Sequence, residues 1–273
     1  MRAAVLLWFL SGACAFAAQW KLVWSDEFDR EGLPDPARWT YEEGFIRNQE
    51  LQYYTRARAE NARIEKGVLV LEARRERYPN PLFQPGSTDW RRAREFAEYT
   101  SASVTTEGKA SWRYGRIEVR AKLPTGRGLW PAIWMLGLNR REVGWPRCGE
   151  IDIMENVGYD PELIHANIHT EAYNHVRGTN KGDRIRLEKP WADFHVYALE
   201  WTPERLDFFV DDSKYFTYEN EKTGPATWPF DQPFYLILNV AVGGSWGGRQ
   251  GVDPAVFPQR MEVDYVRVYQ QGP

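Results

Sequence analysis

Three carboxylate side chains, Glu150, Asp152 and Glu155, stand among apolar residues in one short stretch of the chain. Glu150 and Asp152 are two positions apart, so on a β-strand they point to the same face. Glu155 comes five positions after Glu150 and would point to the opposite face of a regular strand. A β-bulge near Met154 adds one residue and brings Glu155 back beside the other two. We therefore predict a bulged strand that carries three carboxylates on one face.

Such a group of carboxylates indicates cleavage of glycosidic bonds. Close carboxylates repel one another, which raises the pKa of at least one of them. The reaction needs one ionised carboxylate and one protonated carboxylic acid, and retaining enzymes place them about 5–5.5 Å apart. We assign Glu150 as the nucleophile and Glu155 as the general acid and then base, with Asp152 orienting Glu150 or sharing its proton. Taken alone, the motif fits an ordinary solvated strand face equally well.

The surrounding sequence resembles glycoside hydrolase family 16, and within that family the laminarinase-like β-1,3-glucanases. Blocks that look like those of the family stand in the family order at residues 48–55, 114–124, 130–136, 145–155 and 238–246. The resemblance extends from about Trp24 to Tyr269. It implies that residues 19–273 form one catalytic domain.

The alternation of short apolar strands with Gly- and Pro-containing turns predicts an all-β sandwich or barrel. We expect a hairpin from strands at 62–65 and 68–73, a long loop at 76–98, and further strands at 100–106, 115–123, 130–136, 195–201, 206–210, 233–242 and 261–269. The resemblance narrows this to a curved β-sandwich, or jelly roll, with a concave substrate cleft.

The resemblance also implies which side chains contact the sugar or the catalytic carboxylates of the protein: Trp130, Trp134, Trp145, His169, Asn48, Arg74 and Trp246. Two of these have a plain structural alternative, because Trp134 lies in an apolar run and Arg74 at a strand end. Many laminarinases carry an arginine where this chain has Ser103, which removes one expected polar contact.

The histidines allow a second interpretation. His165, Asn167 and His169 alternate and so share a strand face, from which His169 could hydrogen-bond a catalytic carboxylate. A histidine pair at this spacing could instead bind a metal with Glu171, although a third well-spaced ligand is lacking. For His165 and His175 an ordinary polar role is the simpler interpretation.

A structural calcium ion is a further implication of the resemblance. The matching positions are Glu27, the carbonyl of Gly67, and Asp264. Oxygen ligands of this kind suit a hard cation. The alternative is that these acids face solvent. The hydrolysis itself needs no cofactor.

The composition points to an uncharged partner. The formal net charge is −3, which gives no electrostatic ground for binding nucleic acid. The chain contains 13 tryptophans, and those not needed in a core would suit the apolar faces of sugar rings. We expect a polysaccharide as the substrate, no membrane span and a monomeric protein.

The N-terminus resembles a secretory signal peptide over residues 1–18. Arg2 precedes an apolar run, and Ala15-Phe16-Ala17 is an A-x-A-like cleavage site. The run is too short to span a membrane, and the sequence before Cys14 is a poor lipidation signal. We expect a secreted or periplasmic protein in which Cys148 is an unpaired, buried residue.

The leading interpretation is a secreted retaining endo-hydrolase of β-1,3-glucan. Mixed-linkage β-1,3-1,4-glucanases of the family have a shorter acidic motif without the extra residue at Met154. Galactan-cleaving members share the longer motif, but the Trp-Pro-x-x-Gly-Glu context fits the glucanases better. A non-catalytic β-glucan-binding protein would lack catalytic carboxylates, and a generic adhesion module would explain the fold alone.

Overall fold

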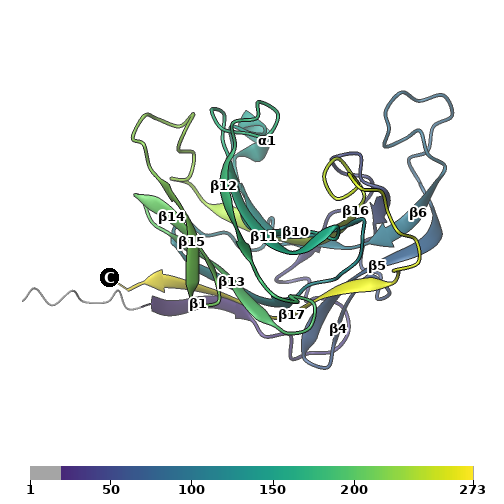
Figure 1. The fold of residues 1–273 in the computed structure, drawn as a ribbon, viewed down its shortest axis with the longest axis horizontal. Coiled ribbons are helices and arrows are strands. Elements are labelled where there is room, and N and C mark those ends of the chain that lie inside the picture. The colour runs from purple at the N-terminus through teal and green to yellow at the C-terminus, as the bar shows by residue number, and fades with distance from the viewer. Residues whose placement is uncertain (1–19, 273) are drawn as a thin grey trace, which may run out of the picture.

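The computed structural model describes residues 20–272, and the predicted signal peptide lies outside these residues. The described chain folds into two curved β-sheets stacked face to face, with one short helix, α1 (Arg140–Val143) (Figure 1). The predicted all-β sandwich is confirmed. None of the helices in the described range is long and apolar enough to cross a membrane.

The larger sheet has ten strands. They are β1 (Trp20–Asp26), β3 (Gln52–Tyr54), β4 (Ala62–Glu65), β5 (Val68–Pro79), β6 (Phe96–Ser101), β8 (Gly115–Lys122), β13 (His195–Trp201), β14 (Arg205–Val210), β15 (Ser213–Glu219) and β17 (Gln259–Gln271). The order is β15-β14-β13-β8-β17-β5-β6-β3, with β1 paired to β17 and β4 paired to β5.

The smaller sheet has seven strands and carries the acidic motif. They are β2 (Thr40–Tyr41), β7 (Ser103–Thr105), β9 (Leu129–Gly137), β10 (Glu150–Val157), β11 (Asp160–His169), β12 (Lys181–Arg186) and β16 (Phe234–Val242). The order is β12-β11-β10-β9-β16-β7-β2, so the acidic strand β10 lies between β9 and β11.

The hydrophobic core fills the space between the two sheets. Ile151, Ile153 and Met154 of β10 are fully buried and belong to the same cluster as Ile117 and Val119 of β8 in the other sheet. Burying each such side chain contributes roughly 1.5–3 kcal/mol. The inward face of β10 is thereby fixed by its apolar residues, which leaves its outward face for the carboxylates.

The bulge predicted in the acidic strand is confirmed. Asp152 lies opposite Trp134 of β9, and the register then shifts before Met154, so that Glu155 lies opposite Ala132. The register with β11 shifts over the same interval. Two successive residues, Ile153 and Met154, are both buried in the core as a result. The extra residue turns Glu155 to the face that carries Glu150 and Asp152.

The predicted hairpin between β4 and β5 is confirmed as well. Lys66 and Gly67 form its two-residue turn, with φ of 53° and 76°. Positive φ at both central residues is the type I′ geometry that matches the twist of paired strands. Gly67 adopts this conformation without steric cost.

The loop predicted at 76–98 is shorter in the structure and spans residues 80–95. The prediction missed that β5 extends to Pro79 and that β6 begins at Phe96, so that Tyr78 lies opposite Ala97. The Tyr78 ring is 5.1 Å from that of Tyr53, so aromatic contact holds this extension in place. The two edge strands β12 and β15 were also missed, because their polar residues outnumber the apolar ones that signal a strand.

The strand predicted at 100–106 is divided between the two sheets. β6 ends at Ser101 in the larger sheet, and β7 begins at Ser103 in the smaller one. Ala102 between them is fully buried. The chain therefore crosses the core here, and a small residue at the crossing leaves room for its neighbours.

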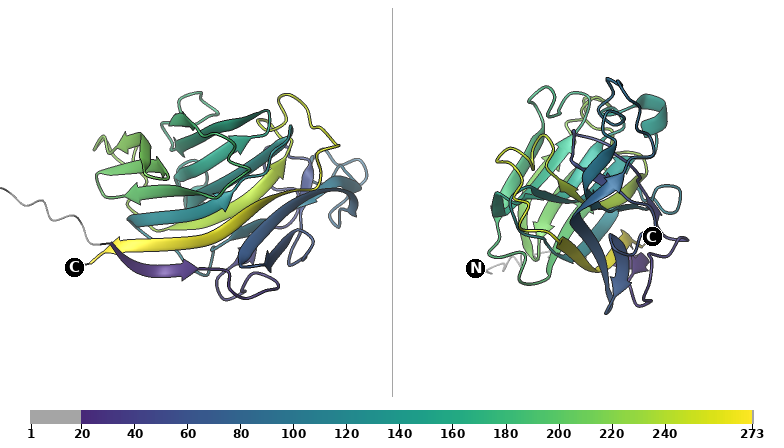
Figure 2. Two further views of the ribbon diagram at one scale, coloured as in Figure 1. Left: turned by 60° about the horizontal axis from the view of Figure 1, so that its bottom comes forward. Right: turned by 90° about the vertical axis from the view of Figure 1, so that its right-hand side faces the viewer.

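The two ends of the described chain lie side by side. β1 pairs antiparallel with β17, with Trp20 opposite Gln271. Figure 2 shows β17 along the length of the larger sheet with β1 beside it. The first and last strands of the described chain are therefore neighbours.

The approach of β9 to the start of β10 depends on a residue without a side chain. Gly137 ends β9, and a Cβ atom built there would lie 2.1 Å from the carbonyl oxygen of Cys148. We predict that Gly137→Ala lowers the free energy of unfolding by about 1–3 kcal/mol, because the backbone cannot yield without moving β10.

Urea unfolding measures this change, and Gly272→Ala is the matched control, since nothing lies within 4 Å of its added Cβ. Equal midpoints for the two variants would contradict the close approach at Gly137.

Candidate active site

A cleft of about 820 Å³ crosses the outer face of the smaller sheet. Glu150, Asp152 and Glu155 all line it, together with residues of β9, β11 and β16 and of the loops beyond them. The bulge thus brings the three carboxylates to one wall. The cleft extends over several strands on both sides of β10, so it can hold several sugar units of a chain.

Glu150 is held by two side chains at the first position of β10. Trp145 donates from Nε1 to Oε2 of Glu150 at 2.9 Å. On the other side, Nε2 of His169 lies 3.5 Å from Oε1. His169 is opposite Glu150 in the register of β10 and β11, which explains why it reaches the carboxylate. Both neighbours fix the orientation of Glu150.

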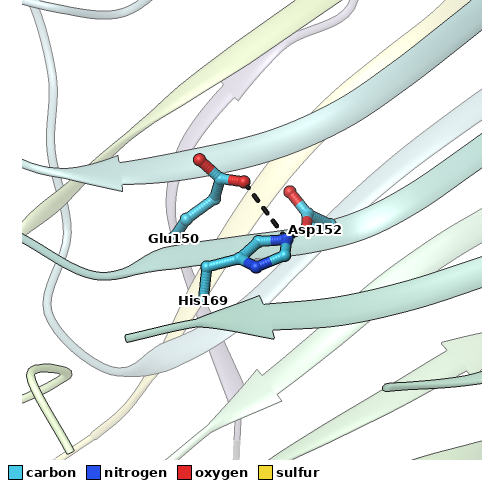
Figure 3. Close-up of side chains that lie close together, drawn as sticks. All are labelled: Glu150, Asp152 and His169. Carbon is cyan, nitrogen blue, oxygen red and sulfur yellow. Dashed lines mark ion pairs between the residues drawn. The ribbon is translucent and has the colours of Figure 1, made fainter. Parts of the chain in front are cut away.

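The imidazole of His169 lies between two carboxylates, as Figure 3 shows. Its Nε2 atom is 3.3 Å from Oδ2 of Asp152, which is only 3% exposed. Burial opposes protonation of this ring, but contact with Asp152 and the charge of Glu150 outweigh it and raise the pKa of His169 to about 9. The predicted contact between His169 and a catalytic carboxylate is confirmed.

Glu155 lies in a different hydrogen-bonding environment. Trp130 of β9 donates from Nε1 to Oε1 of Glu155 at 3.0 Å. Asn167 of β11 donates from Nδ2 to Oε2 at 3.2 Å. Both oxygens of this carboxyl group therefore accept a hydrogen bond from the protein. The contact with Asn167 was not predicted from the sequence, although Asn167 was placed on the same face as His165 and His169.

The two glutamates differ in proton affinity. Burial and the neighbouring Asp152 raise the pKa of Glu150 to about 7 and that of Glu155 to about 8. His169 lowers both values by its positive charge. Because these groups interact, the values belong to the cluster as a whole. A cluster that keeps a proton near neutral pH can pair an ionised nucleophile with a protonated general acid, as the reaction requires.

The same cluster offers a set of possible metal ligands. One atom each from Glu150, Asp152 and His169 lies within 4.8 Å of the other two. An imidazole with a raised pKa holds its proton and repels a cation, so the positive charge of His169 already serves the two carboxylates. The predicted alternative ligand Glu171 is instead bound by Arg147, whose Nε lies 3.1 Å from its Oε1.

Strand pairing brings the segments of the predicted calcium site together beside β17. Asp26 at the end of β1 lies opposite Val266, and Leu69, just after Gly67, lies opposite Val263. Both acids in this region are paired with arginines. Arg267 donates twice to Glu27, at 2.8 and 3.1 Å, and Arg120 donates to Asp264 at 2.5 Å. As they lie, these carboxylates do not fit a shared cation.

Three of the predicted tryptophans line the cleft with their indole N–H groups engaged. Trp130 and Trp145 donate to the two glutamates, as described above. Trp134 is 7% exposed and donates to Oδ1 of Asn239 at 2.7 Å. Trp134 therefore belongs both to a buried cluster and to the cleft wall. Trp246 meets Trp130 edge to face at 5.5 Å.

Of the two predicted polar contacts, only one lies in the cleft. Asn48 lines it and donates to Glu50 at 3.2 Å. Arg74 is not among the cleft-lining residues. It forms ion pairs with Glu72 and Glu76, which lie two positions before and after it on β5. The prediction for Arg74 is thus wrong in position, because alternation along β5 directs it to a face of the larger sheet.

The sequence analysis missed a half-buried arginine, Arg47. Its guanidinium lies 4.8 Å from the centre of the Trp134 ring and pairs with Glu42. Ser103 donates to the same carboxylate at 2.7 Å. A guanidinium therefore lies near Ser103, but it comes from Arg47 and not from the strand position at which the resemblance led us to expect an arginine. The signal was available, since Arg47 directly precedes Asn48 in a block of the family type.

The remaining predictions near the site concern two histidines, the long loop and Cys148. His165 and His175 both line the cleft, and the loop at 80–95 contributes Arg91 to it. Cys148 is free and fully buried, as expected. Burial raises the pKa of its thiol to about 11, which makes it a poor nucleophile.

Comparison with known proteins gives consistent matches over nearly the whole chain. The chain is 57% identical over 263 residues to a beta-glucanase of Rhodothermus marinus, with 93% of this chain and 86% of the relative covered. The X-ray structure of the laminarinase from Rhodothermus marinus superposes with a TM-score of 0.84 at 55% identity, covering 93% of this chain and 99% of that one.

A second solved structure gives the same result. It is a non-specific endo-beta-1,3(4)-glucanase from family 16, 49% identical with a TM-score of 0.84, and the match covers 94% of this chain and 93% of the other. The sequence profile of the family described as "Glycosyl hydrolases family 16" matches residues 49–267. The resemblance noted from the sequence is confirmed, and the chain belongs to glycoside hydrolase family 16.

Proposed function

We propose that the protein is an endo-hydrolase of β-1,3-glucan of the laminarin type that retains the configuration of the anomeric carbon. One observation carries this proposal: Glu150 and Glu155 share the cleft face of a single bulged strand, with Glu150 beside the imidazole of His169 and Glu155 bonded by the N–H groups of Trp130 and Asn167. The names of the similar proteins, a beta-glucanase and a laminarinase, support the choice of substrate.

The proposed reaction has two displacement steps. Glu150 attacks the anomeric carbon while Glu155 transfers its proton to the glycosidic oxygen, so the bond to the leaving sugar breaks and a glycosyl ester with Glu150 forms. Glu155, now ionised, takes a proton from water, and the resulting hydroxide displaces Glu150. Two inversions at one carbon give overall retention.

The neighbouring groups support each step. The positive charge of His169 stabilises Glu150 as the carboxylate that attacks and that later leaves. The N–H of Trp145 orients it. Asp152, buried beside the imidazolium, balances that charge and keeps the ring in place. Residues on both sides of β10 line the cleft, which suits internal cleavage of a long chain.

A broader specificity is the main alternative. A relative that is 49% identical is described as a non-specific endo-beta-1,3(4)-glucanase. Mixed-linkage glucan therefore belongs among the substrates to be tested. A purely glucan-binding role is less well supported, because all three carboxylates are present and face the cleft. A galactan is less well supported because the more similar relatives are named a beta-glucanase and a laminarinase.

We also propose that the protein is exported to the periplasm or the medium and acts as a monomer. The basic start, the apolar run and the A-x-A-like site of residues 1–18 support export. N-terminal sequencing of the protein recovered outside the cytoplasm checks this, with Ala18 or Gln19 as the expected first residue.

The first test is the release of products from laminarin by residues 19–273. We expect short β-1,3 oligosaccharides from the wild type and none from Glu150→Gln, which keeps the shape of the side chain but cannot attack. Barley mixed-linkage glucan and agarose are assayed in parallel. Cleavage of agarose without cleavage of laminarin would contradict the proposed substrate.

Azide rescue distinguishes the two glutamates. In Glu150→Ala, azide can attack directly from the emptied side, and the product should be an α-glycosyl azide. In Glu155→Ala, azide should capture the glycosyl ester on Glu150 and give a β-glycosyl azide. Proton NMR of the anomeric signal identifies each product. The reverse pattern would exchange the assigned roles.

The proton affinities predict a bell-shaped dependence of kcat/KM on pH, with an acid limb from Glu150 and an alkaline limb from Glu155. In His169→Gln the positive charge next to Glu150 is lost, so the pKa of Glu150 rises and the acid limb moves to higher pH. His175→Gln is the matched control, since burial lowers the pKa of His175 and leaves it uncharged. Equal profiles for both variants would contradict the assigned role of His169.

Calcium binding stays a prediction of the family resemblance, and it requires that the cation displace Arg267 from Glu27. In that case calcium raises the melting temperature, EGTA reverses the rise, and Glu27→Gln abolishes it. A site filled at 100 times its Kd stabilises a protein by about 2.7 kcal/mol. An unchanged melting temperature would mean that the arginine pairs persist.

A further inference from the structure

A chain of side-chain amides leads from Glu155 to the edge of the smaller sheet. Nδ2 of Asn167 donates to Oε2 of Glu155 at 3.2 Å. Oδ1 of the same Asn167 accepts a hydrogen bond from Nδ2 of Asn180 at 3.0 Å. Both asparagines line the cleft, and neither has a role in the mechanism given above.

The path of this chain depends on Gly182. In the register of β11 with its neighbours, Asn167 lies between Asp152 of β10 and Gly182 of β12. A Cβ atom at position 182 would lie 2.3 Å from Oδ1 of Asn167. The missing side chain leaves the space in which the Asn167 amide extends across β12 to Asn180.

The direction of the Asn167 amide matters for proton transfer. An amide can present either its N–H or its carbonyl oxygen. An N–H facing Glu155 favours the ionised carboxylate, whereas a carbonyl would favour the protonated acid and draw its proton away from the substrate. Trp130 can only donate and already occupies Oε1. With N–H groups on both oxygens, neither of these two neighbours accepts the acidic proton, which stays available to a sugar oxygen in the cleft.

We propose that Asn180 holds the carbonyl of Asn167 and thereby turns the Asn167 N–H toward Glu155, which positions the acid–base carboxyl for proton transfer to the leaving sugar. Asn167 and Asn180 are positioning residues, because they act through Glu155. The inference rests on the proposed function in one respect, the assignment of Glu155 as the acid–base residue.

Other charged or titratable groups also face Glu155, and the variants below leave them unchanged. They are Glu150 and Asp152 on β10, His165 and His169 on β11, and Tyr215 on β15. Their contributions are the same in every variant, so a difference between variants reports on the amide chain.

The test is the pH profile of kcat/KM on laminarin for Asn180→Asp. An aspartate at 180 only accepts hydrogen bonds, so the Asn167 N–H turns to it and the Asn167 carbonyl faces Glu155. The pKa of Glu155 then rises, and the alkaline limb moves up by about half a pH unit or more. At neutral pH kcat falls several-fold, because the proton of Glu155 is directed at Asn167.

The matched control separates this effect from the added charge. Asn167→Ala removes the amide, so Asn180→Asp in that background can act on Glu155 only through its charge. We expect the shift caused by Asn180→Asp to be much smaller there. Equal shifts in both backgrounds, or no shift in either, would overturn the proposal. Should Asn167→Ala not fold, Asn167→Ser replaces it.

A second readout isolates acid catalysis. A dinitrophenyl leaving group needs no protonation, so the first step on a dinitrophenyl β-laminaribioside should be nearly unchanged in Asn180→Asp. An equal loss on both substrates would indicate a general structural defect and would contradict the proposal. Failure of the wild type to cleave laminarin would refute the proposed function, whereas normal cleavage with unshifted profiles would refute only the role of Asn180.

Discussion

The active site depends on the burial of three carboxyl groups on one face of one strand. Burial in a medium of low dielectric penalises charge, and mutual repulsion adds to the penalty. The structure offsets this with few groups: one imidazole between Glu150 and Asp152, the indole N–H groups of Trp145 and Trp130, and the amide of Asn167. All of these come from β9, β11 or the loop before β10. The pairing of three strands therefore sets the electrostatics of the site.

Three tryptophans of the cleft combine a place in its wall with a hydrogen bond from the indole N–H. In Trp130, Trp134 and Trp145 the indole ring lines the cleft, while its N–H is bonded to a polar side chain. Trp134 shows this most clearly, since its N–H meets Asn239 and its ring faces Arg47. An indole fixed at two points cannot rotate freely, so its ordering is already complete before a ligand arrives.

The features predicted correctly are those that local sequence periodicity determines. The spacing of Glu150 and Glu155 led us to predict a bulge, and the alternation around His169 placed it on one face with His165 and Asn167. Both features are present in the structure. The errors concern contacts between distant segments. Arg74 was misplaced because its strand, β5, belongs to the larger sheet and not to the sheet that carries the cleft, and Arg47 was missed because one of its contacts, the Trp134 ring, lies on the distant strand β9.

The pairing of the first and last strands has a consequence for attaching this protein to other objects. Both described ends lie side by side on the larger sheet, while the cleft opens on the outer face of the smaller one. A linker joined at either end, to a resin, a cell surface or a second enzyme, therefore starts from the sheet that does not carry the cleft. Such a tether leaves long glucan chains free to enter the cleft, and it does so equally well from either end.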